Sequence, residues 1–276
     1  MPEHVAVGVD AAPDGWVAVQ YHDREYASVH RYADTDADGS AFRALWTDLW
    51  SDLETVDAEH LTVLVDVPIG LPDDDPAREP EVQARKRLEN RQSSVFNVPI
   101  REILDEDDYA TANATQKECV DKGLMQQTFN ITHRIREVDS VLRDDAATEA
   151  TQDRIREAHP EVCFWALNDH QDMRFSKSSQ PAAAYWERVD ALAAVHPDVT
   201  DDHGDRRSAF HDALADAGSA LLDWDDPALS NDDLLDAFAL AVTASSLTGE
   251  FQTLPDDPGE DEEGLRMEMV YAHPES

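Results

Sequence analysis

The chain has 276 residues, of which 41% are hydrophobic and 30% charged, a composition typical of a folded protein of one or two domains and not of a disordered one. No apolar run approaches the roughly 18 residues that a membrane-spanning helix needs, and the N-terminus lacks the features of a signal peptide. Cys119 and Cys163 exclude a disulfide framework and lack the spacing of a zinc site. We therefore expect a cytoplasmic protein with reduced thiols and no membrane partner.

The charge balance is strongly acidic. Sixty acidic and 22 basic residues give a net charge of −38, and only four residues are lysine. Acids at this density repel one another in a compact fold, and concentrated salt screens that repulsion. The acids are spread over every segment, which favours a halophilic protein adapted to a salt-rich cytoplasm. The alternative is an acidic protein that mimics or solvates nucleic acid, but such a protein would concentrate its acids in blocks.

Basic residues concentrate in one part of the chain. Residues 78–156 hold 13 bases and 16 acids, whereas the rest of the chain holds 9 bases and 44 acids. Within this part, the segment Ala77–Arg101 is net positive. Pairing between Glu and Arg on helix surfaces is one explanation; phosphate binding by an arginine cluster is the other, which we favour. The predicted phosphate contacts are Arg85, Arg87, Arg91, Ser93, Ser94, Lys122 and Arg136, with His133 and Arg134 as further candidates. For Arg136, pairing with Glu137 or Asp139 is an equal alternative.

Strand patterns dominate the first part of the chain. Three alternating segments predict an antiparallel meander, and a fourth, almost entirely apolar segment predicts a strand that is covered on both faces. A helical period before the fourth strand predicts a helix, preceded by a polar loop at Asp34–Ser40. The predicted strands are His4–Asp10, Gly15–Asp23, Tyr26–Tyr32 and His60–Val67, and the predicted helix is Ala41–Leu53.

A helical insertion at about 78–155 is predicted to follow the fourth strand. Leucine, isoleucine and valine recur there at helical spacing. The insertion separates the fourth strand from a fifth, predicted over Arg156–Leu167. The predicted helices of the insertion are Pro80–Arg91, Arg101–Asp108, Asn113–Asp121 and Thr128–Asp145.

The last part of the chain is predicted to be mainly helical. Helices are expected over Ala182–Val195, Asp205–Leu222 and Ser230–Ser246, the last with Ser230 or Asn231 as its N-cap. Residues 255–264 are expected to form a solvated acidic loop before a short strand at Leu265–Tyr271. Without an internal repeat or a linker, the simplest organisation is one α/β domain, 1–276, around a mixed five-stranded sheet flanked by helices.

Four acidic residues stand out by their positions. Asp10 and Asp66 end apolar strands, Glu161 lies in the predicted fifth strand, and Asp236 lies in the last helix, one turn after Asp233. Burying an unpaired carboxylate costs several kcal/mol, so such positions require a cation, a base or a metal ion. Carboxylates that converge from strand ends and a helix are the hard oxygen ligands that Mg²⁺ or Mn²⁺ prefers.

Each acid also has a structural explanation. Asp10 and Asp66 are placed to cap the turns that follow them, and Asp232 and Asp233 suit the first turn of a helix. Glu161 suits a pair with an arginine. Any one of 60 acids is more often structural than catalytic, so the prediction depends on the joint pattern.

Seven segments in chain order carry a family resemblance: VGVDAAPDGWVAV, LVDVPIGLP, RQSSVFNVP, KGLMQQTFNITHRIREVD, AHPEVCFWALN, DDLLDAFALAVTA and GLRMEMVY. With them the sequence resembles the DUF429 family, predicted nucleases of the ribonuclease H-like superfamily. The family motif is altered at RQSSVFNVP, where this chain has Asn97.

The resemblance implies a ribonuclease H-like fold and metal-dependent hydrolysis of phosphodiester bonds in nucleic acid. Two Mg²⁺ or Mn²⁺ ions about 4 Å apart would hold the attacking water and the leaving oxygen. The implied catalytic residues are Asp10, Asp66, Glu161 and Asp236, and the implied metal ligands are Asp10, Asp66, Asp233 and Asp236, with Asp10 bridging the ions.

Two functions of other classes remain open. A phosphotransferase of the actin and sugar-kinase type also has an Asp at the end of its first strand, but it needs glycine-rich phosphate loops, and the ten glycines here are scattered singly. A non-catalytic module could bind nucleic acid or a nucleotide through the arginine segment. A metal titration separates the nuclease from that module.

Overall fold

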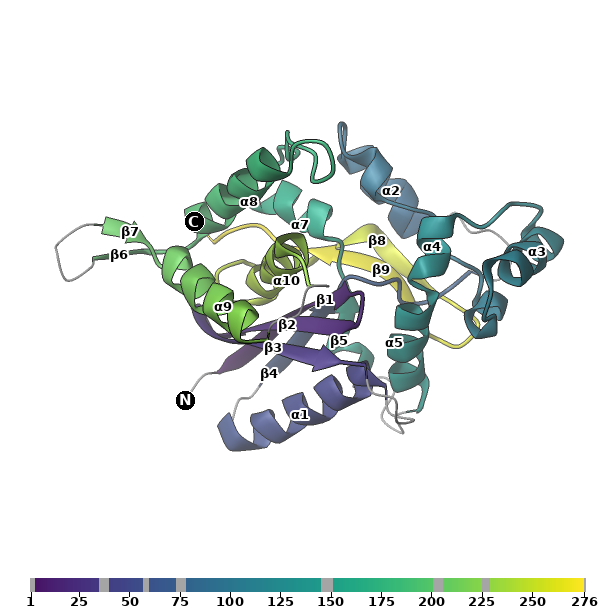
Figure 1. The fold of residues 1–276 in the computed structure, drawn as a ribbon, viewed down its shortest axis with the longest axis horizontal. Helices are drawn as coiled ribbons and strands as arrows, with labels where there is room; N and C mark the ends of the chain where they lie inside the picture. The colour runs from purple at the N-terminus through teal and green to yellow at the C-terminus, as the bar shows by residue number, and fades with distance from the viewer. Residues whose placement is uncertain are drawn as a thin grey trace.

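The computed structural model describes residues 3–34, 40–56, 60–72, 78–144, 151–200, 206–224 and 229–275. A five-stranded sheet in the order β3-β2-β1-β4-β5 forms its centre, with helices on both faces (Figure 1). β1, β2 and β3 pair antiparallel, whereas β1, β4 and β5 pair parallel. The mixed α/β sheet predicted from the sequence is thus confirmed. The strands are β1 His4–Ala12, β2 Gly15–His22, β3 Glu25–Ala33, β4 His60–Val65 and β5 Ile155–Glu157.

The alternation of residues along β1 explains the layers on either side of the sheet. Val5, Val7 and Val9 point to the face covered by α1 (Ala41–Val56) and α5 (Thr132–Asp144). Ala6 points to the opposite face, covered by α7 (Pro160–Leu167) and α10 (Asn231–Ala244). In Figure 1 α1 lies below the sheet and α5 at its right-hand side, whereas α7 and α10 lie above it. No helix in the described part of the chain is both long and apolar enough to span a membrane.

Gly8 allows α10 to lie directly against β1. A Cβ atom on Gly8 would come within 2.1 Å of the Ala237 carbonyl oxygen and 2.2 Å of the Ala241 nitrogen. Both are backbone atoms of a helix, so neither can move aside alone. The glycine therefore sets how closely the helix that carries Asp236 approaches the strand that carries Asp10.

We expect Gly8→Ala to lower the free energy of unfolding by about 3 kcal/mol, because the methyl group forces the helix off the sheet. Gly218→Ala in α9 (Phe210–Trp224) is the matched control, since its Cβ would meet nothing within 4 Å. Alanine raises helix propensity there, so the control should gain up to about 1 kcal/mol. Urea unfolding measures both variants, and equal stabilities would contradict the close packing.

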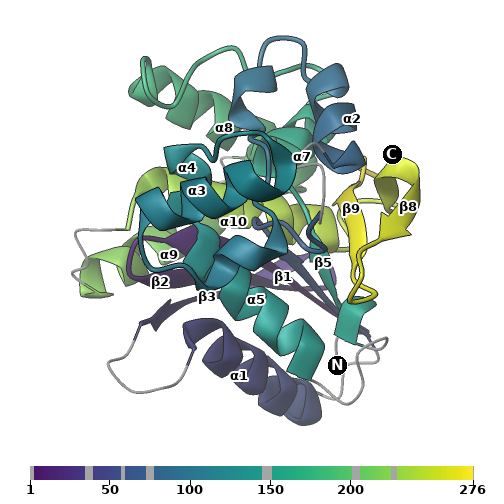
Figure 2. The same ribbon diagram turned by 90° about the vertical axis from the view of Figure 1, so that its right-hand side faces the viewer.

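The helical insertion lies between β4 and β5 and gathers over one end of the sheet (Figure 2). Its predicted helices are present with different bounds. The segment after Arg101 is a 3-10 helix, and the predicted helix over 128–145 is broken at Ile131. Besides α5, the elements are α2 Glu79–Arg87, η1 Gln92–Ser94, η2 Arg101–Asp105, α3 Tyr109–Val120 and α4 Gln126–Asn130.

The predicted fifth strand over Arg156–Leu167 is right only at its start. β5 ends at Glu157, and residues 160–167 form helix α7. His159 caps this helix, because its Nδ1 accepts a hydrogen bond from the Glu161 N–H at 3.2 Å, and a proline occupies the first helical position. Every residue of α7 is buried, so the segment has no amphipathic period and resembles a buried strand in sequence.

Two predictions near the C-terminus need correction. Residues 252–260 form strand β8 (Gln252–Glu260), which pairs with β9 (Arg266–Tyr271), so much of the predicted acidic loop is a strand. The register shifts between Leu254 and Gly259, which accommodates residues that cannot join the ladder. The helix predicted from Asp205 begins at Phe210, after a small pair of strands, β6 (Asp198–Thr200) and β7 (Arg206–Ser208).

The remaining predicted helices agree with the structure. The helix expected over 182–195 is α8 (Pro181–Val195), and Ser230 is the N-cap of α10. Residues 35–39 of the predicted polar loop lie outside the described residues.

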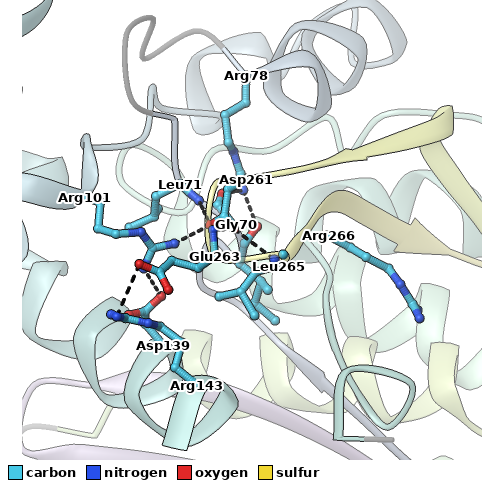
Figure 3. Close-up of polar contacts among 12 residues, drawn as sticks. Gly70, Leu71, Arg78, Arg101, Asp139, Arg143, Asp261, Glu263, Leu265 and Arg266 are labelled. Carbon is cyan, nitrogen blue, oxygen red and sulfur yellow. Dashed lines mark hydrogen bonds and ion pairs between the residues drawn. The ribbon is translucent and has the colours of Figure 1, made fainter. Parts of the chain in front are cut away.

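Asp261 connects the β8–β9 hairpin to the rest of the fold through hydrogen bonds and an ion pair (Figure 3). Its buried carboxylate accepts hydrogen bonds from the N–H groups of Leu71 at 2.9 Å and Leu265 at 2.8 Å, and it pairs with Arg101. Arg101 also pairs with Asp139 of α5. One arginine of the predicted anion-facing segment thus joins the insertion, the loop after β4 and the C-terminal hairpin.

Arg78 has a similar structural role at the start of that segment. Its fully buried guanidinium donates to the Ile69 and Gly70 carbonyl oxygens, both at 2.6 Å, and pairs with Glu81 at 2.5 Å and Glu157 at 2.8 Å. A buried cation paired on all sides in this way fixes the course of the chain as it leaves β4.

Candidate metal centre and adjoining cavity

Asp10 and Asp66 meet at the carboxyl ends of two adjacent parallel strands. The parallel register pairs Val9 with Val65, and these aspartates are the next residues along β1 and β4. The Asp66 N–H donates to the Val9 carbonyl oxygen at 3.0 Å, and the Ala11 N–H donates to Asp10 Oδ1 at 2.8 Å. These main-chain bonds hold both carboxyl groups at one edge of the sheet, with Asp10 only 6% exposed.

Helix α10 brings two further acids towards that edge. Asp233 forms a capping box with Ser230: its N–H donates to Ser230 Oγ at 3.2 Å, and its Oδ2 accepts from the Ser230 N–H at 2.9 Å. Asp236, one turn later, is 8% exposed and pairs with Lys177. Asp233 therefore stabilises the helix start, whereas Asp236 is the acid of α10 that is buried in the site.

Glu161 lies at the N-terminal end of α7 and pairs with Arg188 of α8, which is completely buried. The expectation of an arginine partner for Glu161 is thus met in the structure. Its second oxygen, Oε2, is buried, as is Asp236 Oδ1, and neither has a hydrogen-bond partner among the residues that the structure describes. Two buried carboxylate oxygens are thus left to accept a bond from a cation or a ligand.

Burial and mutual repulsion raise the pKa values of the acids at this site. Burial raises the pKa of Asp10 well above its usual value, and Asp66, Asp236 and Asp233 raise it further by repulsion. Burial also raises the pKa of Asp66, against the opposing effects of His159 and Lys177. Burial raises the pKa of Asp236 to about 6, although Lys177 opposes it. Keeping all the carboxylates ionised together is therefore costly, and added positive charge would relieve that cost.

Lys177 is a residue of the site that sequence reasoning missed. It lies in the loop between α7 and α8, with 25% of its side chain exposed, and contacts Asp236. Burial works against its charge, but Asp236 and Glu161 raise the pKa of the ammonium group above its usual value. The one feature of the sequence that could have pointed to Lys177 is the rarity of lysine, which occurs at only four positions in the chain.

The donor set fits a divalent metal ion, although it does not form a closed cage. Within the described ranges, no group of three or more His, Cys, Asp or Glu side chains is arranged to hold a metal ion. Mg²⁺ needs no such cage, because it is usually bound through one or two carboxylates, with waters and substrate phosphates completing its shell. Asp10 and Asp66 supply two such carboxylates, and the unpartnered Asp236 Oδ1 supplies a third oxygen nearby.

A cavity of about 430 Å³ opens beside these acids. Asp10, Asp66 and Asp233 line one side of it. The loop of residues 94–99, together with residues of α4, lines it from the insertion. The acids at the strand ends therefore line the same cavity as the segment that connects η1 to η2.

The predicted phosphate contacts are dispersed in the structure. Ser94 lines the cavity, and Ser93 is exposed beside it in sequence. Arg85 donates to the Val95 carbonyl oxygen at 3.0 Å and to Asn97 Oδ1 at 2.5 Å, so it supports the cavity loop from behind. Arg91 donates to the Met173 carbonyl oxygen at 2.6 Å.

Three other predicted contacts lie on the surface of the fold. Arg87 is exposed and stacks over the Trp165 ring, 5.8 Å from its centroid. Arg136 lies 3.5 Å from Asp105, and Lys122 is exposed after α3. None of these three residues lines the described cavity.

Comparisons with known proteins give a family and nothing more specific. Neither the curated proteins nor the solved structures include a significant match to the chain. One family model, described as a protein of unknown function (DUF429), matches residues 8–260. That range contains Asp10 in the second half of β1, the helical insertion and α10 with Asp236. The chain belongs to the DUF429 family.

Proposed function

We propose that this protein is a metal-dependent nuclease of the ribonuclease H-like type, with Mg²⁺ or Mn²⁺ as its cofactor. The observation that carries the proposal is the convergence of Asp10, Asp66 and Asp236 from two parallel strands and one helix. Hard oxygen donors with raised pKa values suit a divalent ion, and a phosphodiester is a substrate that such an ion activates. The resemblance of the motifs to predicted nucleases supports the same reaction.

The side chains of the site divide into ligands and groups that orient them. Asp10 and Asp66 would hold the metal ion, with Asp236 and Asp233 as further ligands. The ion supplies Lewis acidity to the phosphoryl group and lowers the pKa of a bound water. Lys177 favours the ionised form of Asp236 and fixes its orientation. Arg188 donates to one oxygen of Glu161 and fixes its orientation.

His159 has an orienting role in this proposal. Its Nδ1 accepts from the Glu161 N–H at 3.2 Å, and its Nε2 lies 3.3 Å from the Ser94 carbonyl oxygen. Both ring nitrogens are thereby engaged with the main chain. The histidine ties α7 to the cavity loop and leaves proton transfer to water.

A second candidate is a non-catalytic module that binds a nucleotide. The cavity favours it, because about 430 Å³ is typical of sites for small molecules. Several arginines that were predicted to contact phosphate are instead bonded within the fold. The module would bind its ligand with or without a divalent ion at the carboxylates.

Cleavage of a nucleic-acid panel in molar KCl tests the proposal. Single-stranded and duplex DNA and RNA are incubated with Mn²⁺, with Mg²⁺ and with EDTA. We expect cleavage of at least one substrate with either ion, none in EDTA, and recovery when Mn²⁺ is added in excess. Binding of a nucleotide without cleavage of any substrate would favour the second candidate.

A further inference from the structure

The cavity beside the carboxylates has the dimensions of a site for one small ligand. Its volume of about 430 Å³ lies within the range of roughly 300–1,000 Å³ that small-molecule sites occupy, and it cannot enclose a nucleic-acid helix. The ends of β1, β4 and β5 form one side of it, and the loop of residues 94–99 forms another. A ligand here would meet acidic groups at one end and the insertion at the other.

Phe96 presents an aromatic ring to this space. It lines the cavity and is 41% exposed, whereas its neighbours Val95 and Val98 are each only 4% exposed. Val95 and Val98 also line the cavity, so what distinguishes Phe96 is that the largest apolar side chain of the loop is the one left exposed. An aromatic ring held in this way is a platform on which a planar ring can stack, and bases stack on such rings whatever their sequence.

Carboxamide side chains surround the same space. Asn97 belongs to the cavity loop, and Gln127 and Asn130 belong to α4. A carboxamide has one acceptor and one donor group, the pattern that matches the hydrogen-bonding edge of a nucleobase, and the Asn130 oxygen already accepts from Gln126 Nε2 at 2.9 Å. Arg85 holds the Asn97 oxygen at 2.5 Å, which fixes the amide orientation before any ligand arrives.

The charge of the protein limits how many phosphates such a ligand can carry. Arg85, Arg91, Arg101 and Arg134 are all hydrogen-bonded to protein groups, so their guanidinium groups are engaged within the fold. The chain carries a net charge of −38, and each additional phosphate of a long polyanion adds repulsion. A ligand with a single phosphate near the carboxylates avoids most of that repulsion.

We infer that the cavity binds one nucleotide unit, with its base on Phe96 and its phosphate at Asp10 and Asp66. The unit is either a free mononucleotide or the terminal or extruded nucleotide of a single strand. The inference rests on the proposed function, because a divalent ion at the carboxylates is what would hold the phosphate there.

Calorimetric titration with Mg²⁺ in molar KCl tests the inference. The probes are nucleoside 5′-monophosphates and ribose 5-phosphate, which has the phosphate without the base. We expect at least one monophosphate to bind about 10- to 100-fold more tightly than ribose 5-phosphate, and Phe96→Ala to remove that difference. Phe96→Tyr keeps the ring and should keep the affinity. Trp186→Ala is the matched control, because Trp186 is 59% exposed and lies outside the cavity.

Equal binding of ribose 5-phosphate and every monophosphate, or a monophosphate affinity unchanged by Phe96→Ala, would overturn the inference. A single-stranded oligonucleotide and a blunt duplex distinguish the sources of the nucleotide: binding of the oligonucleotide in a Phe96-dependent manner indicates a chain end or extruded unit. If the duplex binds more tightly than the oligonucleotide and the monophosphates, the inference is also overturned. Phe96-dependent binding with no cleavage in any metal ion would uphold the cavity assignment and reject the nuclease. Duplex cleavage unaffected by Phe96→Ala would support the nuclease and reject the cavity assignment.

Discussion

Asp10→Asn is expected to abolish metal-dependent cleavage while raising the stability of the metal-free protein. Loss of a group that merely supports a metal ligand costs 10- to 100-fold, so loss of a central ligand should lower the rate by more than about 100-fold. Asparagine keeps the oxygen that accepts the Ala11 N–H, and it removes a charge that Asp66, Asp236 and Asp233 repel. A relief of about 1 kcal/mol would raise the melting temperature by about 2–4 °C.

The pH dependence of stability provides a second readout for the same variant. The pKa of Asp10 is raised in the folded protein, and that of Asp236 is raised to about 6, so the folded state binds these protons more tightly than the unfolded chain does. The contribution of these acids to stability in EDTA should therefore be fully present below the unfolded value near 4 and be lost as the pH rises through about 6. Asp10→Asn should flatten this decline, since one of the protons is no longer exchanged.

Asp232→Asn is the matched control for both readouts, because Asp232 lies in the first turn of the same helix and outside the cavity. Added Mn²⁺ should stabilise the wild type and Asp232→Asn, and it should have little effect on Asp10→Asn. Undiminished cleavage by Asp10→Asn would locate the chemistry elsewhere.

The melting temperature is expected to rise steadily between low and molar KCl. The Debye length shortens from about 10 Å at 0.1 M salt to about 3 Å at 1 M, so repulsion among the acids on the surface weakens. Buried pairs such as Arg78 with Glu157 respond little, because they are shielded from the solvent ions. Calorimetric scans in a KCl series measure the slope, and a flat or falling melting temperature would reject the halophilic interpretation.

Nucleic-acid affinity should depend on salt only weakly over the same range. Counterion release weakens phosphate binding by arginines as salt rises, whereas screening of the surrounding acids strengthens it. Since Arg85 and Arg91 are bonded within the fold, we expect the two effects to offset each other. A steep loss of affinity with salt would show that the basic segment dominates the binding of nucleic acid.

Local patterns were enough to predict the sheet, because residue alternation and apolar runs report directly on burial. They failed at residues 160–167, where complete burial erased the helical period, and at residues 255–260, where prolines and acids concealed a strand. In both places the outcome depends on what packs against the segment, which a local pattern does not contain.

The residues of the candidate site were likewise predictable only in part from local patterns. Asp10 and Asp66 could be located because the ends of parallel strands meet at one edge, whatever the rest of the chain does. Lys177 could not, because its loop has no period, and its contact with Asp236 spans 59 residues. The partners of Arg78 and Arg101 depend on similar long-range contacts, so the arginine segment resembled a phosphate surface in the sequence although much of it is structural.

The pairs of Lys177 with Asp236 and of Arg188 with Glu161 have a consequence for the order in which ligands bind. Five acids at the site repel one another electrostatically: Asp10, Asp66, Glu161, Asp233 and Asp236. When all are ionised, the two bases reduce the combined charge of the cluster from −5 to −3. A phosphodiester, itself an anion, would be repelled by that remainder. Nucleic acid should therefore enter second, after the divalent ion, and should bind poorly to the metal-free protein. Lys177 and Arg188 bring the cluster close enough to neutrality to fold, yet leave it negative enough to require a cation before its substrate.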